Sequence, residues 1–123
     1  MAKKNPKRIL IVDDEADFCQ LLASALHVRD YHVYTAFNGK MALEIMRDIK
    51  PDLLLLDIKM PVMDGNQVME TMVKEKLRIP TVVISAYCDD MSDAFTSELP
   101  VKGCLAKPVT LEDIINIVKE TIG

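Results

Sequence analysis

The chain has 123 residues, of which half are hydrophobic and none is Trp, so we expect one domain with an aliphatic core that includes methionine. The net charge of −4 argues against direct nucleic-acid binding. No apolar stretch reaches membrane-spanning length, and we expect no signal peptide before the first strand. Cys19, Cys88 and Cys104 share no metal-ligand spacing, so reduced thiols in a cytoplasmic protein are expected.

The first half of the chain alternates between short apolar runs and amphipathic segments. Residues 8–13 are predicted to form a strand, and residues 15–28 a helix. A half-buried strand at 32–37 ends at an Asn-Gly pair, and a helix at 40–49 ends before Pro51. The apolar face of the first helix is assigned to Phe18, Leu21, Leu22, Ala25 and Leu26.

The second half continues the alternation. It is predicted to contain a strand at 53–57, a helix at 66–77, a strand at 81–85, a weaker helix at about 90–99 and a strand at 102–106. Thr110 is expected to cap a last helix that ends near Ile122. The chain therefore consists of five strand–helix units.

Regular alternation of this kind predicts an α/β fold with a doubly wound, five-stranded parallel sheet, similar to flavodoxin. We expect the strand order 2-1-3-4-5, with the first strand at the centre and next to the third. The single domain should occupy residues 1–123, with its core at about 7–122.

Three aspartates follow the first and third strands. Asp13 and Asp14 end one apolar run, and Asp57 ends the other. Because ligands bind beyond the carboxyl ends of strands in open α/β sheets, the three carboxylates are expected to share a pocket. Such crowding is unfavourable unless a cation neutralises it, and Mg²⁺ prefers oxygen ligands of this kind. Each acid alone could be a helix cap. Ser85 and Lys107, however, also stand at the ends of strands that reach this edge, and the combination favours a functional pocket.

Four motifs at these strand ends carry a resemblance to a known family. They are Ile11-Val12-Asp13-Asp14-Glu15, Leu56-Asp57-Ile58-Lys59-Met60-Pro61-Val62-Met63-Asp64-Gly65, Ile84-Ser85-Ala86-Tyr87 and Lys107-Pro108. Together the motifs resemble those of the receiver domain of response regulators in two-component signalling, over essentially the whole chain. The resemblance implies a phosphorylation-controlled switch rather than an enzyme, apart from its own phosphorylation and slow autodephosphorylation.

The resemblance also implies roles for individual residues. Asp57 would accept a phosphoryl group from a sensor histidine kinase or a phosphotransfer protein, and a carboxylate is able to act as such a nucleophile. Lys107 would place a positive charge at the phosphoryl oxygens, and the Ser85 hydroxyl would donate to another of them. Mg²⁺ would be held by Asp13, Asp14, Asp57 and the backbone carbonyl of Lys59. The Lys107–Pro108 bond would be cis, although the sequence alone does not exclude a trans turn before the last helix.

Three positions depart from the usual pattern of the family. The glycine that commonly ends the fourth helix is replaced near Pro100, and Gly103 comes later. Cys104 stands where Tyr or Phe is usual, three residues before Lys107, and Val109 replaces the usual aromatic residue after Lys-Pro. Cys104 is expected to be a small buried hydrophobic residue. Tyr87 and Lys59 would border the approach of water to a phosphorylated Asp57, and neither is suited to recruit it, so slow hydrolysis is expected.

Three alternatives stay open at this stage. A phosphate-independent interaction module is compatible with Cys104. A phosphatase of the haloacid dehalogenase type would need a second Asp two residues after Asp57, where this chain has Lys59. A flavodoxin-like cofactor binder would need a Gly/Ser-rich loop after the first strand. The sequence leaves open whether the output is an effector domain or a separate protein, and whether the chain forms a homodimer.

Overall fold

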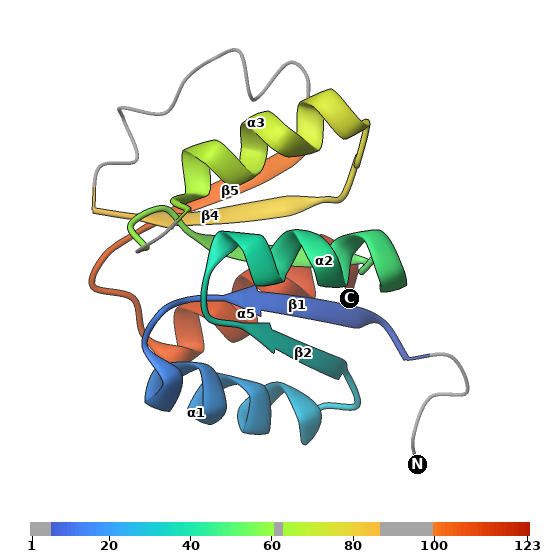
Figure 1. Ribbon diagram of the computed structural model, residues 1–123. Coiled ribbons are helices and arrows are strands. Elements are labelled where there is room, and N and C mark those ends of the chain that lie inside the picture. Colours follow the sequence, from blue (N-terminus) through green and yellow to red (C-terminus); the bar gives the residue numbers. More distant parts are fainter. Residues whose placement is uncertain (1–5, 61–62, 87–99) are drawn as a thin grey trace.

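The computed structural model describes residues 6–60, 63–86 and 100–123 (Figure 1). Its strands are β1 (Arg8–Val12), β2 (His32–Ala36), β3 (Leu53–Asp57), β4 (Thr81–Ser85) and β5 (Val101–Ala106). Its helices are α1 (Ala16–His27), α2 (Gly39–Ile49), α3 (Gly65–Glu75) and α5 (Leu111–Ile122). The helix predicted at about 90–99 lies outside the described residues, as do Tyr87 and Cys88.

The five strands form one parallel sheet in the order β2-β1-β3-β4-β5, which confirms the predicted topology. The middle strand is β3, so the expectation that the first strand is central is wrong. Residues of β1 and β3 are direct neighbours, with Val12 opposite Leu56. The carboxyl ends of these two strands therefore meet at one edge of the sheet.

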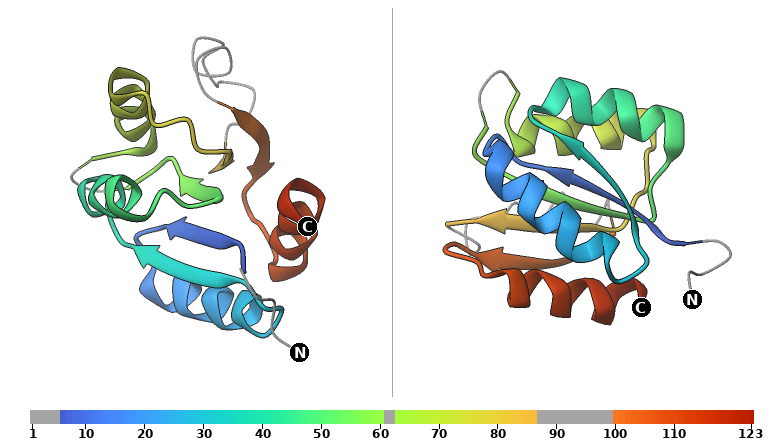
Figure 2. Two further views of the ribbon diagram at one scale, coloured as in Figure 1. Left: turned by 90° about the vertical axis from the view of Figure 1, so that its right-hand side faces the viewer. Right: turned by 90° about the horizontal axis from the view of Figure 1, so that it is seen from below.

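Helices cover both faces of the sheet and form two hydrophobic cores, one on each side (Figure 2). On one side α2 and α3 pack over Leu54 and Leu56, and on the other α1 and α5 pack over Leu53 and Leu55. All of β3 is buried, and its alternate side chains serve the two cores in turn. A strand buried on both faces reads as an uninterrupted apolar run, which explains the sequence of four leucines before Asp57.

The buried face of α1 differs from the predicted one. Leu22 and Leu26 are buried as expected, but Leu21 is 56% exposed and Cys19 takes the remaining place against the sheet. Positions 19, 22 and 26 lie on one side of a helix with 3.6 residues per turn, and position 21 lies outside that stripe. The prediction of Leu21 as a core residue is therefore wrong.

The two loops beside the carboxyl end of β3 are tightly packed. A Cβ atom on Gly39, at the start of α2, would lie 2.7 Å from the backbone oxygen of Met63. A Cβ atom on Gly65, at the start of α3, would lie 2.7 Å from the Cα atom of Ile58. Only glycine allows these approaches, so both helices begin in direct contact with the loop that follows Asp57.

The cysteines are not all reduced thiols. Cys19 is a free, buried thiol, whereas Cys104 is disulfide-bonded, so the expectation of reduced cysteines is wrong for Cys104. The side chain of Cys104 is half-buried against the core on the α2 and α3 side. No helix in the described part of the chain has the length and hydrophobicity needed to cross a membrane.

Candidate functional site

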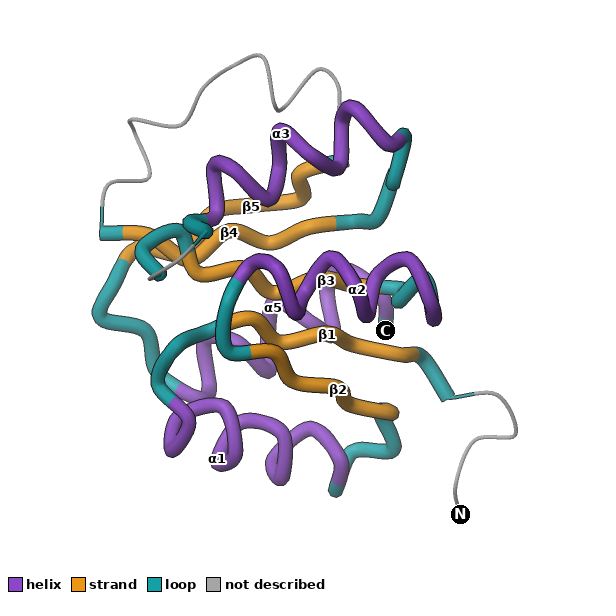
Figure 3. The backbone as a smooth tube through the Cα atoms, in the orientation of Figure 1, coloured by secondary structure: helices purple, strands orange, loops and turns teal. Residues whose placement is uncertain are grey.

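The loops that follow β1, β3 and β5 gather at the carboxyl edge of the sheet, on the left in Figure 3. Asp13 directly follows β1, and Asp57 is the last residue of the neighbouring β3. One carboxylate oxygen from each of Asp13, Asp14 and Asp57 lies within 4.8 Å of the others. The structure thus brings together the three acids that the strand order predicted.

Asp57 is the most deeply buried of these acids, with a side chain only 1% exposed. Its Oδ1 atom lies 3.0 Å from the Nζ atom of Lys107 and accepts a hydrogen bond from the backbone N–H of Lys59 at 3.2 Å. Its Oδ2 atom is buried and has no hydrogen-bond partner among the described residues. A buried carboxylate oxygen without a partner is unfavourable, and a bound cation would compensate it.

Asp13 is also buried, at 4% exposure, and its Oδ1 atom accepts a hydrogen bond from the backbone N–H of Glu15 at 2.9 Å. Burial raises the pKa of Asp13 to about 6, because the hydrogen bond from Glu15 and the charge of Lys107 offset only part of the loss of hydration. The negative charge of Asp57 contributes to this increase.

Asp14 differs from the other two acids because it is exposed to solvent. Asp14 borders a pocket of about 450 Å³, which extends to the start of α3. A cation could therefore reach the two buried acids from the side of Asp14. Three carboxylates at this spacing match the oxygen ligands that Mg²⁺ takes in proteins, and one of them has an oxygen without a hydrogen-bond partner in the described ranges.

The contact between Asp57 and Lys107 shifts the titration of both groups. Burial raises the pKa of Asp57, although the nearby Lys107 ammonium group lowers it. Burial alone would lower the pKa of Lys107, but its hydrogen bond and charge interaction with Asp57 outweigh burial and raise it. Lys107 therefore remains protonated at neutral pH and places a fixed positive charge beside the carboxylate.

The remaining predicted residues surround this pair. Ser85 is half-buried at the end of β4, and its backbone oxygen accepts a hydrogen bond from the backbone N–H of Lys107 at 3.0 Å. The Lys107–Pro108 bond is cis, as the resemblance implied. Lys59 contacts Asp57 through its backbone N–H, and its side chain is exposed.

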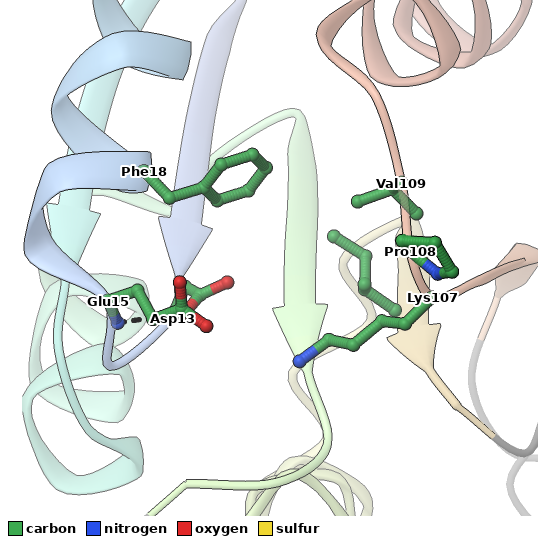
Figure 4. Close-up of a pocket in the computed structure, with 7 residues that line it drawn as sticks. Asp13, Glu15, Phe18, Lys107, Pro108 and Val109 are labelled. Atoms are coloured by element: carbon green, nitrogen blue, oxygen red, sulfur yellow. Dashed lines mark hydrogen bonds between the residues drawn. The ribbon is translucent and has the colours of Figure 1, made fainter.

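A pocket of about 420 Å³ adjoins the acids on the side of α1 (Figure 4). Asp13 and Glu15 lie on one side of it and Lys107, Pro108 and Val109 on the other, while the ring of Phe18 points into the space between them. The residues that line the pocket are Asp13, Glu15, Phe18, Ile84, Lys107, Pro108 and Val109. The sequence analysis assigned Phe18 to the core, although its place one helical turn after Glu15 is also typical of a residue beside the site.

Sequence reasoning missed one contact at the site. The thiol of Cys19 donates a hydrogen bond to the backbone oxygen of Asp13 at 3.3 Å. Burial, together with the charge of Asp13, raises the pKa of this thiol to about 11, so it keeps its proton at neutral pH. Helical spacing places residue 19 on the sheet-facing side of α1, and this was the signal that could have found it.

Comparison with known proteins identifies the family. Residues 9–119 match the response regulator receiver domain. Regulatory protein AtoC of Escherichia coli K12 is 32% identical over 115 residues, which cover 94% of this chain and 25% of AtoC. The chain thus spans only a quarter of that relative.

Solved structures agree with this match. A CheY-like receiver domain protein from Methanospirillum hungatei JF-1 has a TM-score of 0.82 and 27% identity, covering 94% of this chain and 93% of that one. Response regulator TrrA from Thermotoga maritima, solved in complex with Mg²⁺ and BeF, has a TM-score of 0.78 and 31% identity, covering 94% and 99% of the two chains. The chain therefore belongs to the response regulator receiver domain family, whose members act as phosphoryl-accepting switches in two-component signalling.

Proposed function

We propose that Asp57 accepts a phosphoryl group from a phosphohistidine of a sensor histidine kinase or a phosphotransfer protein. The observation that carries the proposal is the buried Asp57 carboxylate, which faces Asp13, Asp14 and the ammonium group of Lys107. One of its oxygens has no hydrogen-bond partner in the part of the chain that the structure describes. The receiver core spans about residues 7–122, and phosphorylation controls an attached effector domain or a separate output protein.

In the transfer, a carboxylate oxygen of Asp57 forms a bond to phosphorus as the bond from phosphorus to the histidine nitrogen breaks. The imidazole keeps the electron pair of that bond and takes up a proton. Lys107 stabilises the negative charge on the phosphoryl oxygens, and the Ser85 hydroxyl donates a hydrogen bond to one of them. Because little covalent chemistry is required of the protein, positioning and charge account for the rate.

Asp13, Asp14, Asp57 and the backbone carbonyl of Lys59 would hold Mg²⁺. When bound, Mg²⁺ supplies positive charge that offsets the repulsion between the carboxylates and an incoming phosphoryl group. The Mg²⁺ complex of TrrA, a relative of 31% identity, supports this assignment. The buried Asp57 oxygen supports it independently.

The direct test is phosphorylation by acetyl phosphate, with and without Mg²⁺, followed by intact-protein mass measurement. We expect one labile phosphoryl adduct that needs Mg²⁺ and is absent from Asp57→Asn. The matched control is Asp52→Asn, since Asp52 precedes the opposite end of β3 and accepts a hydrogen bond from the backbone N–H of Arg8 at 2.8 Å. Labelling of Asp57→Asn at the wild-type level would rule out Asp57 as the acceptor.

The same experiment also tests two of the three alternatives. A phosphate-independent interaction module would acquire no adduct, and a phosphatase would release phosphate steadily without accumulating one. The second alternative has little support, because the exposed side chain of Lys59 occupies the position where such a phosphatase needs an acid.

A further inference from the structure

The backbone N–H and the backbone carbonyl of Asp13 form hydrogen bonds with different elements. Its N–H donates to the backbone oxygen of Ala36 in β2 at 3.1 Å, and this bond continues the pairing of the sheet. Its carbonyl oxygen accepts the hydrogen bond from the Cys19 thiol, whose side chain is 1% exposed. Among the described residues, no other group donates to this oxygen. At this carbonyl the hydrogen-bond donor is therefore a side chain of α1 and not a backbone group of the sheet.

This oxygen belongs to the peptide group that joins Asp13 to Asp14. Rotation of that peptide changes the direction of the side chains on either side of it, so its orientation determines where both carboxylates lie. The hydrogen bond from Glu15 N–H to Asp13 Oδ1 fixes the same turn at the carboxylate. The side chain of Glu15, the residue before α1, makes no capping hydrogen bond, so the turn is not held by a conventional helix cap.

We infer that Cys19 is a positioning residue for the metal-binding acids: its thiol holds the Asp13–Asp14 peptide in the orientation that directs both carboxylates at the site. The inference rests on the proposed Mg²⁺ site. The thiol is a weak donor, but the contact is buried, and a carbonyl that loses its donor there must either stay unsatisfied or rotate. The role thus differs from simple packing, which any apolar side chain of similar size would provide.

The test compares variants that separate the donor from the packing. Cys19→Val keeps an apolar side chain of similar size without a donor, and Cys19→Ser keeps a donor. We expect Cys19→Val to bind Mg²⁺ about two- to fivefold more weakly than wild type in an NMR titration. Cys19→Ser should remain within about twofold of wild type. Cys19→Ala, which also lacks the donor, gives the same comparison if the Val variant folds poorly.

A control variant separates positioning from general loss of stability. Leu22 lies on the same buried face of α1, and its side chain has no donor that could form a hydrogen bond with Asp13. Leu22→Val should lower the unfolding temperature and leave the Mg²⁺ affinity unchanged. Equal affinity in wild type, Cys19→Val and Cys19→Ala would overturn the inference, as would a Cys19→Ser variant that binds as weakly as Cys19→Val.

A second measurement needs no metal. The hydrogen bond from Glu15 N–H to Asp13 Oδ1 should protect that amide from hydrogen exchange in wild type and Cys19→Ser, and exchange should be faster in Cys19→Val. If wild type binds no Mg²⁺, the proposed metal site fails, and the exchange of the Glu15 amide then decides the positioning role alone. Unchanged exchange in Cys19→Val would overturn it.

Discussion

In the absence of Mg²⁺, the acid cluster should make the protein less stable as the pH rises from about 4 to about 7. Burial holds the pKa of Asp13 at about 6, above its ordinary value of 3.8. Between these values the folded protein keeps a proton that the unfolded chain has lost. The stabilisation is therefore complete below the unfolded pKa and disappears as the pH rises through the folded pKa.

The size of the effect follows from the two pKa values. The gap between 3.8 and about 6, taken at about 1.36 kcal/mol per pH unit, corresponds to roughly 3 kcal/mol in the free energy of unfolding. The pKa of Asp57 is also raised by burial, so Asp57 adds a change of the same sign. Bound Mg²⁺ should counteract the loss, and a concentration ten times its Kd would add about 1.4 kcal/mol at neutral pH.

Urea unfolding followed by far-ultraviolet circular dichroism is the suitable assay, because the chain has no Trp to report by fluorescence. Asp13→Asn keeps an oxygen that can accept from Glu15 N–H but cannot titrate, so it should remove the part of the pH-dependent loss that comes from Asp13 and leave the part that comes from Asp57. Asp17→Asn, an exposed acid in the first turn of α1, is the control and should follow wild type. The reasoning is refuted if Asp13→Asn loses as much stability between about pH 4 and 7 as wild type does.

Three further predictions concern single residues. Gly39→Ala should lower the free energy of unfolding by about 1–3 kcal/mol, because its Cβ atom would crowd the backbone oxygen of Met63; an unchanged urea midpoint would contradict this packing. Asn38→Ala should cost about 1 kcal/mol through loss of the α2 cap, and Asn38→Ser should recover most of it in the same assay. Lys107→Met should steepen the decline of stability with pH, because Asp57 loses the neighbour that lowers its pKa; a decline parallel to wild type would disprove that coupling.

The sheet order and the meeting of the three acids could be predicted because each depends on a local pattern. Apolar runs that stop at polar residues mark the strands, and the strand order then places the acids together. The buried face of α1 was harder, because apolar residues at 18, 21, 22, 25 and 26 are compatible with more than one helical phase, and Leu21 was assigned to the wrong side.

Contacts between distant residues left no signal in the sequence. The ion pair of Arg47 with Glu75 joins α2 to α3 through hydrogen bonds of 2.7 Å and 2.6 Å, yet neither residue belongs to a local pattern that names the other. The hydrogen bond from Cys19 to the Asp13 carbonyl is a different case: helical spacing indicates that residue 19 faces the sheet, but it does not indicate which backbone atom accepts from the thiol. The bonding state of Cys104 also depends on the tertiary structure.

The burial of β3 has a mechanical consequence. Its leucines are locked alternately into the two cores, so the strand cannot slide or tilt without repacking both sides of the sheet. Asp57 is thus part of a strand that is packed on both faces, whereas its partner Lys107 lies in a loop and is one-third exposed. We therefore expect a chemical change at the carboxylate to shift the exposed loops around the pocket rather than β3 itself.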